Sequence, residues 1–282
     1  MCLLYIIHMM HKKYMKYMRY MIGGNLKVYV IANQKGGIGK TTTATALAAI
    51  LQGMGKRTLL IDADQQGNST DTYRAEIEGH ATLYDVLLED DRIPLKDAIQ
   101  KTEIGDIVAS DPLLREGDVK LSSDLDGVYR LSEAIEQLEG YDYVVIDTAP
   151  ALNHVLYNCL IASDEVIIPV TADRYGLQGL AQLSEAIRKI QKRQNPRLKI
   201  SGLLLVKYNG RTLLSQEVSR SLNKIAEEME TKVFASKIRE STKTREAQAM
   251  RKSLIEYAEK STTAEDYKAF AKELLEVNDG EK

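Results

Sequence analysis

The stretch at residues 35–42, KGGIGKTT, constrains the fold of this chain more than any other. An apolar run at residues 28–32 precedes it and predicts a buried strand, and the Ala- and Thr-rich residues 42–52 after it predict a helix. A strand, a glycine-rich turn and a helix in this order form a phosphate-binding loop, because glycine lets the backbone N–H groups converge on an anion. The helix N-terminus adds a partial positive charge. We therefore expect a nucleotide site at this loop.

The loop contains two lysines with different expected roles. In a phosphate-binding loop, Lys40 reaches the β- and γ-phosphates and the Thr41 hydroxyl binds Mg²⁺. One lysine is enough to hold a nucleotide in its own subunit, so Lys35 is the unusual residue, and Asn33 replaces the first glycine of the usual pattern. Lys35 is either a solvated loop lysine or a residue that serves the nucleotide of a second subunit. The predicted nucleotide contacts are Lys35, Gly36, Gly37, Ile38, Gly39, Lys40, Thr41, Thr42 and Lys207.

Acidic residues follow two further apolar runs. Residues 59–61 lead into Asp62 and Asp64, and residues 144–146 lead into Asp147. Ligands of open α/β sheets bind at the carboxyl ends of the strands, where these side chains would lie. A buried strand that ends in Asp is the Walker B form, which holds Mg²⁺ through water. The alternatives are a strand-end carboxylate that only structures the loop at Asp62, and a turn or capping residue at Asp64.

Strands and helices alternate from residue 27 to the end of the chain, which predicts an α/β fold with a doubly wound, mostly parallel sheet. The chain has no Trp and only two Phe among 282 residues, so its core must be aliphatic, as in a parallel sheet covered by helices. We expect one domain at residues 27–282. Besides the elements above, we expect strands at 107–109, 166–170, 200–206 and 233–235, a polar loop at 65–70, and helices at 82–88, 94–100, 131–138, 177–192, 213–229 and 264–277.

The first 26 residues are predicted to be a disordered or dispensable extension. Residues 1–24 are rich in Met and Tyr and carry four Lys or Arg with no acid. A basic segment that lies on a membrane surface is the alternative, and Met21 could be the start codon. No stretch reaches the ~18 apolar residues that span a membrane. Cys2 and Cys159 have no metal or redox spacing, which fits a reducing cytoplasm.

Three motifs occur together in this chain, namely the loop at 35–42, DADQQGN at 62–68 and DTAP at 147–150. In this combination the chain resembles the ParA/Soj partition ATPases, within the deviant Walker A family that includes MinD. The resemblance covers residues 27 to 276. It implies a P-loop NTPase fold and an ATPase that uses ATP and Mg²⁺. The family commonly has Ile-Pro-Arg where this chain has Ile238-Arg239-Glu240, so the details of the adenine pocket are not predicted.

The resemblance assigns roles to the matching residues. Lys35 would cross a nucleotide-sandwich dimer to the partner's γ-phosphate, and Asp64 would orient the attacking water. The implied catalytic residues are Asp64, Lys35 and Lys40, and the implied metal residues are Thr41, Asp62 and Asp147. A lysine supplied by the partner would make ATP binding and dimerisation one linked equilibrium.

The resemblance also implies DNA as a partner. The ATP-bound homodimer would bind DNA without sequence preference, and a separate centromere-binding, ParB-like protein would stimulate hydrolysis. The net charge of −2 requires a local basic patch, and residues 237–252 hold six basic residues against two acidic ones. A solvated charged face is the alternative. The expected DNA contacts are Arg211, Lys243, Arg245, Arg251 and Lys252.

Two other functions compete with partition on nucleoid DNA in the cytoplasm. A MinD-like membrane switch would need a basic amphipathic C-terminal helix, but acids balance bases at residues 267–282, so we do not expect membrane binding. A metal-cluster protein of the nitrogenase iron-protein type would need paired cysteine ligands, and Cys159 has no companion.

Overall fold

The computed structural model describes residues 26–89, 91–173, 179–209 and 213–280. Within these residues, eight strands form one sheet in the order β3-β4-β2-β5-β1-β6-β7-β8, and all neighbouring pairs except β3–β4 are parallel. The strands are β1 Lys27–Ile31, β2 Thr58–Ala63, β3 Ile99–Lys101, β4 Asp106–Val108, β5 Tyr143–Thr148, β6 Glu165–Thr171, β7 Lys199–Tyr208 and β8 Val233–Arg239. The prediction of a doubly wound, mostly parallel sheet is confirmed.

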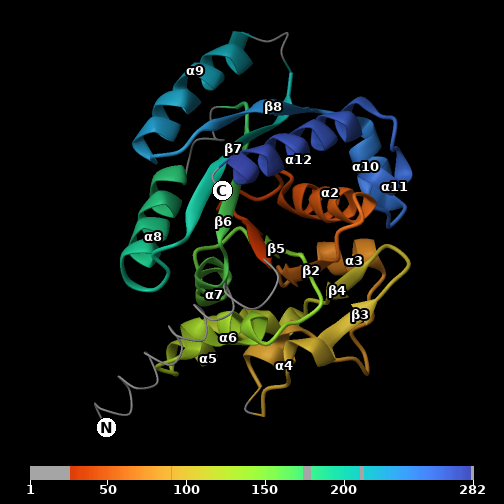
Figure 1. The fold of residues 1–282 in the computed structure, drawn as a ribbon, viewed down its shortest axis with the longest axis vertical. Helices are drawn as coiled ribbons and strands as arrows, with labels where there is room; N and C mark the ends of the chain where they lie inside the picture. The colour runs from red at the N-terminus through yellow and green to blue at the C-terminus, as the bar shows by residue number, and fades with distance from the viewer. Residues whose placement is uncertain (1–25, 90, 174–178, 210–212, 281–282) are drawn as a thin grey trace.

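Helices cover both faces of this sheet (Figure 1). One group, α2, α10, α11 and α12, lies on one side, and α4, α5, α6 and α7 lie on the other. The helices are α2 Lys40–Gly53, α3 Asn68–Tyr73, α4 Leu83–Leu87, α5 Gly117–Ser122, α6 Arg130–Glu136, α7 His154–Ala162, α8 Leu180–Arg193, α9 Leu213–Glu228, α10 Thr242–Ala249, α11 Leu254–Tyr257 and α12 Thr262–Gly280, with 3₁₀ turns at Leu95–Ala98, Pro112–Glu116 and Gly127–Tyr129. Within the described residues, no helix is both long and apolar enough to span a membrane.

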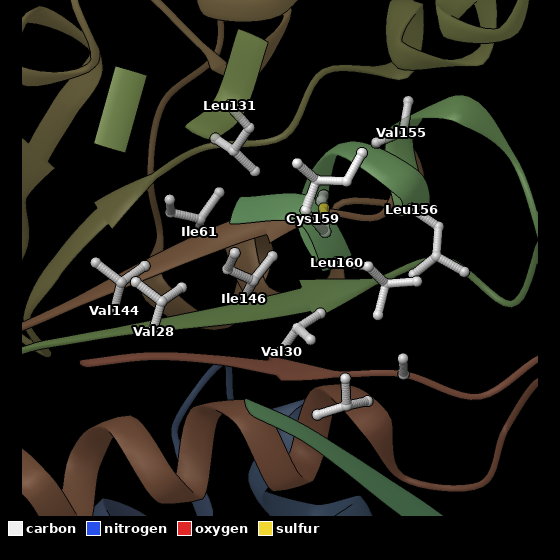
Figure 2. Close-up of a cluster of buried hydrophobic side chains, with 14 of the residues drawn as sticks. Val28, Val30, Ile61, Leu131, Val144, Ile146, Val155, Leu156, Cys159 and Leu160 are labelled. Carbon is white, nitrogen blue, oxygen red and sulfur yellow. The ribbon is translucent and has the colours of Figure 1, made fainter. Parts of the chain in front are cut away.

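Alternate residues of β1 point into two separate cores, because successive side chains of a strand face opposite sides of a sheet. Val28 and Val30 pack into the cluster that α4 to α8 cover, whereas Tyr29 and Ile31 pack under α2 and α12. Figure 2 shows the first cluster, in which Val28 and Val30 lie among side chains of β2, β5, α6 and α7. Both cores are largely aliphatic, as the composition predicted. Strand β1 is buried on both faces and pairs with β5 and β6, so it is held rigidly, and the loop that follows it starts from a fixed position.

Several segments differ from the sequence-based expectations. The expected helix at 94–100 is a 3₁₀ turn followed by the edge strand β3, and helix α3 begins inside the expected polar loop at 65–70. Helices α10 and α11 were not predicted, because α10 buries only Ala247 and so lacks an apolar stripe. Their first turns are instead fixed by caps, since the hydroxyls of Ser241 and Ser253 accept hydrogen bonds from backbone N–H groups of the helices that follow.

Candidate nucleotide site

The loop between β1 and α2 has the backbone conformation that an anion cradle requires. Gly37 and Gly39 have φ of 69° and 93°, which L side chains rarely adopt, although a Cβ at either position would have open space. Gly39 is the N-cap of α2, and no side chain caps this helix. The N–H groups of its first turn therefore point to the position that a phosphate would take.

A cavity of about 600 Å³ opens beside this loop, a volume typical of small-ligand sites. The loop and the start of α2 form its floor. Residues from β2–α3, from the ends of β7 and β8, from α10 and from α12 complete the lining. The lining side chains beyond the loop include Asp64, Gln66, Asn68, Asp71, Thr72, Lys207, Arg239, Glu240, Thr244, Arg245, Gln248 and Tyr267.

Lys40 lies at the floor of the cavity as a buried cation. Its Nζ donates a hydrogen bond to the Lys35 carbonyl at 3.2 Å. Burial lowers the pKa of Lys40, and the carboxylates of Asp147 and Asp64 oppose that shift. A buried ammonium with so few partners gains more from an added phosphate than an exposed one does, because little water competes with the phosphate.

Asp62 and Asp147 lie side by side at the ends of neighbouring strands, where β2 and β5 pair them in register. Both are fully buried. Asp62 Oδ2 accepts hydrogen bonds from the Thr70 N–H at 2.7 Å and the Thr70 hydroxyl at 2.8 Å. Asp147 Oδ2 accepts one from the Ser69 hydroxyl at 2.8 Å. Helix α3 is therefore fastened to both carboxylates through two consecutive residues.

Burial raises the pKa of both carboxyls. The charge of Asp147 raises the pKa of Asp62 further, and that of Asp64 raises the pKa of Asp147, while the nearby hydroxyls of Thr41 and Ser69 lower the pKa of Asp147. A bound cation would lower the pKa of both carboxyls again, since it favours their ionised form.

These residues fit Mg²⁺. Asp147 Oδ1 is buried and has no hydrogen-bond partner among the described residues, so it can accept from a water bound to the metal. Mg²⁺ prefers oxygen ligands and usually combines one or two protein groups with waters and phosphate oxygens. In the described part of the chain, no cluster of three or more His, Cys, Asp or Glu could hold a metal without such added ligands. The Thr41 hydroxyl and the Asp147 carboxylate are the residues that would position the ion.

Asp64 lies in a turn and also lines the cavity. Its Oδ1 accepts a hydrogen bond from the Gln66 N–H at 3.0 Å, and its carbonyl accepts one from the Ser110 hydroxyl at 2.6 Å. The turn contact that the alternative interpretation expected is thus present, and the same carboxylate faces the cavity beside Lys40. The two roles are compatible, because the turn contact uses one oxygen and fixes the direction of the other.

Lys35 contacts groups of its own chain. Its Nζ donates to Asp173 Oδ1 at 2.8 Å, to Asp173 Oδ2 at 2.9 Å and to the Thr171 hydroxyl at 3.1 Å. Asp173 follows the end of β6, which pairs with β1 on the edge opposite to β5. Lys35 is therefore held in an ion pair and is not merely solvated, and it is not among the residues that line the cavity.

Lys207 reaches the phosphate loop from the end of β7. Its Nζ donates to the Gly37 carbonyl at 2.6 Å, and its backbone is in the left-handed region with φ of 50°. The side chain lines the cavity. The structure therefore brings Lys207 to the loop, 170 residues away in sequence.

Of the five predicted DNA contacts, three form ion pairs within the chain, one lines the nucleotide cavity and one is not described. Arg211 lies outside the described residues. Lys243 pairs with Glu246 at 2.7 Å and Lys252 with Glu256 at 2.9 Å. Arg251 Nε donates to Asp71 Oδ1 at 2.7 Å, and Arg245 lines the nucleotide cavity. Much of the positive charge in this segment is thus neutralised within the chain.

Sequence reasoning missed several residues of the site. Ser69 and Thr70 belonged to the stretch that we expected to be a polar loop, and two hydroxyls shortly after a strand-end Asp are the only signal that could have found them. Tyr267 is buried beside the cavity, and its hydroxyl shares a hydrogen bond with Thr43 at 3.1 Å. Asp173 could have been noticed as an acid just past a strand end, but nothing in its sequence neighbourhood connects it with Lys35.

Together, the phosphate loop, the two buried strand-end carboxylates and the mostly parallel sheet define a P-loop NTPase. The family described as AAA domain matches residues 26–200. The chain is 36% identical over 261 residues to the chromosome partitioning protein ParA of Caulobacter vibrioides, covering 90% of this chain and 96% of that protein. It is 35% identical to the chromosome-partitioning ATPase Soj of Thermus thermophilus, covering 90% and 98%. The chain belongs to the ParA/Soj family of ATPases.

A solved structure shows the same fold. Cobyrinic acid a,c-diamide synthase from Mycobacterium smegmatis, solved with bound ADP and magnesium, has a TM-score of 0.78 and 29% identity to this chain, covering 91% of this chain and 97% of that one. The match extends over both halves of the sheet, because so little of either chain is left out. The resemblance seen in the sequence motifs is thus confirmed at the level of family and fold.

Proposed function

We propose that this chain is a Mg²⁺-dependent ATPase of a DNA partition system, and that ATP binds in the cavity beside residues 35–42. The observation that carries the proposal is the meeting of four groups at the carboxyl edge of the sheet. These are the glycine cradle, the buried Lys40, the cavity-lining Asp64 and the unsatisfied oxygen of Asp147. The assignment to partition is supported by relatives that are named for chromosome partitioning.

Hydrolysis of ATP needs positioning and charge neutralisation rather than covalent help from the protein. Lys40 and the N-terminus of α2 neutralise the β- and γ-phosphates. Thr41 and Asp147 position Mg²⁺. Asp62 holds α3 in place beside them, because its carboxylate accepts both hydrogen bonds from Thr70. Asp64 accepts a hydrogen bond from the attacking water and orients it, since its turn contact with Gln66 fixes the carboxylate.

ATP binding assembles a homodimer in which Lys35 serves the partner's nucleotide. In the single chain, Lys35 is engaged by Asp173. A triphosphate on the facing subunit offers more negative charge than one carboxylate does, so Lys35 changes partner when two loaded chains meet. Dimerisation is therefore coupled to the presence of the γ-phosphate, and ADP does not support it.

The ATP-bound dimer binds DNA without sequence preference through basic residues of the C-terminal part, namely Arg211, Lys243, Arg245, Arg251 and Lys252. The ion pairs that hold Lys243 and Lys252 are exposed and therefore weak, so DNA phosphates can displace the acids. One subunit binds weakly, with a Kd of roughly 10⁻⁴–10⁻⁶ M, and pairing two subunits strengthens binding through effective concentration.

A separate centromere-binding protein stimulates hydrolysis and so releases the dimer from the nucleoid. This places the protein in the cytoplasm, on nucleoid DNA. The chain itself supplies the switch, because loss of the γ-phosphate returns Lys35 to Asp173 and separates the two DNA-binding surfaces.

DNA binding measured with ATP, ADP and no nucleotide tests this proposal. We expect binding only with ATP, equal affinity for unrelated sequences, and a steep loss of affinity between low and moderate salt, because phosphate contacts release counterions. The Lys40→Ala variant, which cannot hold the nucleotide, is the matched control and should bind like the nucleotide-free protein. ATP-dependent binding to anionic vesicles with no binding to DNA would contradict the proposal and favour a membrane switch.

A further inference from the structure

One ion pair connects α3 with the segment that follows α10, and both helices line the nucleotide cavity. Asp71 belongs to α3, and Arg251 follows the end of α10. Arg251 Nε donates to Asp71 Oδ1 at 2.7 Å, and Nη2 donates to the same oxygen. The two residues are 180 positions apart. The contact therefore joins two segments that are far apart in the sequence.

Arg251 adopts a backbone conformation that normally favours glycine. Its φ is 51°, in the left-handed region. The Arg251 N–H donates to the Gln248 carbonyl at 3.0 Å, and the next N–H donates to the Ala247 carbonyl at 3.1 Å, which is the pattern of a helix C-terminus that ends on a left-handed residue. A long side chain at such a position strains the backbone, and persistent strain suggests that the side chain has a role. Among the described residues, the hydrogen-bond partner of that side chain is Asp71.

The Asp71–Arg251 ion pair lies between two helices that line the cavity. Asp71 and Thr72 of α3 and Thr244 and Gln248 of α10 all line the cavity, and Thr72, Thr244 and Gln248 also surround one small pocket next to it. Helix α10 also makes a polar contact with α2, but this contact is long. Gln248 Nε2 donates to the Thr42 hydroxyl at 3.5 Å. Helix α3 cannot follow α10 outward, because Ser69 and Thr70 fasten it to Asp147 and Asp62. Moving α10 away from the cavity therefore breaks the pair.

We propose that the Asp71–Arg251 ion pair is a strap that holds α10 against α3 and slows the release of the nucleotide from the cavity. This gives Arg251 a role in nucleotide retention in its own subunit, in addition to the DNA contact proposed above. The inference rests on the nucleotide cavity and not on DNA binding. Both side chains are more than half exposed, at 57% and 54%, so the strap opens readily and its effect is modest.

The test is the dissociation rate of a fluorescent ADP analogue, displaced by excess unlabelled ADP in a stopped-flow instrument. Asp71→Asn and Arg251→Gly should each accelerate release about two- to fivefold, which is the range for an exposed ion pair. The double variant should release no faster than the single variants, because both remove the same contact. Glycine tolerates a φ of 51°, so Arg251→Gly keeps the turn and should retain the wild-type Tm.

Glu256→Gln is the matched control, because it removes the exposed pair with Lys252 in the same segment without touching α3. It should leave the release rate unchanged. Unchanged release in both Asp71→Asn and Arg251→Gly would overturn the proposal. If release is unchanged while Arg251→Gly weakens DNA binding and Asp71→Asn strengthens it, Arg251 is a DNA contact and the strap does not exist. Failure of ATP-dependent DNA binding in the wild type would leave the strap unaffected.

Discussion

Removing the carboxylate that holds Lys35 should promote dimerisation. Asp173 pairs with Lys35 at 2.8 Å and 2.9 Å, and both side chains are partly exposed, at 29% for Lys35 and 42% for Asp173. A pair with this exposure is worth about 0.5–1 kcal/mol after solvent screening. Each chain must give up one such pair when Lys35 reaches the partner's nucleotide, so the dimer gives up two, or about 1–2 kcal/mol.

The Asp173→Asn variant does not carry that cost. Because 1.4 kcal/mol corresponds to a factor of ten, the dimer of the variant should dissociate with a Kd about five- to thirtyfold lower than that of the wild type. Sedimentation over a range of protein concentrations, with Mg²⁺ and an ATP analogue that is not hydrolysed, measures this directly. Thr171 remains in the variant as a hydrogen-bond acceptor for Lys35, so the lysine keeps its place in the loop.

Two controls make the result specific. The double variant Lys35→Ala/Asp173→Asn should not dimerise, since the gain depends on the lysine. The variant Glu185→Gln removes an exposed pair with Lys189 on α8, away from the loop, and should leave the Kd unchanged. An Asp173→Asn protein that dimerises no better than the wild type would refute the idea that this ion pair competes with the dimer contact.

The remaining predictions concern the carboxylates and the loop. Asp64→Ala should bind ATP and dimerise like the wild type while the single-turnover hydrolysis rate falls about a hundredfold or more, because the water loses its acceptor; hydrolysis at the wild-type rate would exclude the role of Asp64. Burial raises the pKa of Asp62 in the folded protein above its value in the unfolded chain. With respect to this group, the folded protein is therefore most stable at acidic pH, where Asp62 is protonated, and it loses this stability as the pH rises through the raised pKa. Relative to the wild type, the Tm of Asp62→Asn without Mg²⁺ should therefore improve from about pH 5 to about pH 8, and a constant difference would contradict the shift. Lys207→Met should weaken ATP binding by equilibrium titration, because it loses the contact with Gly37, and unchanged affinity would exclude Lys207 from the site.

Local sequence patterns predicted the parts of the site that depend on local geometry. The strand, the glycines and the helix at residues 27–53 form a continuous unit, so KGGIGKTT was enough to place Lys40 and Thr41. Asp62 and Asp147 were predicted from apolar runs that end in an acid, because parallel strands bring their carboxyl ends to one edge. These predictions needed no knowledge of which strands are neighbours.

Contacts between distant segments could not be predicted in this way. Lys35 and Asp173 are 138 positions apart, and Asp71 and Arg251 are 180 positions apart. Their meeting depends on sheet order and on the placement of α3 and α10, which are short helices fixed by caps and tertiary contacts rather than by an apolar stripe. Propensity and periodicity are weak for such helices, so the sequence did not show which acidic residues their charged neighbours would meet.

A mixing experiment tests the shared nucleotide site most directly. Lys35→Ala and Asp64→Ala should each be inactive as ATPases when assayed alone. In a mixed dimer, the Lys35→Ala chain keeps Asp64 in its own site and receives Lys35 from the Asp64→Ala chain, so one of the two sites is complete. We predict that mixing the two inactive proteins restores ATP hydrolysis, with a rate that rises with the fraction of mixed dimer. If Lys35 acted only within its own chain, neither site would be complete, and a mixture that stays inactive would contradict this account.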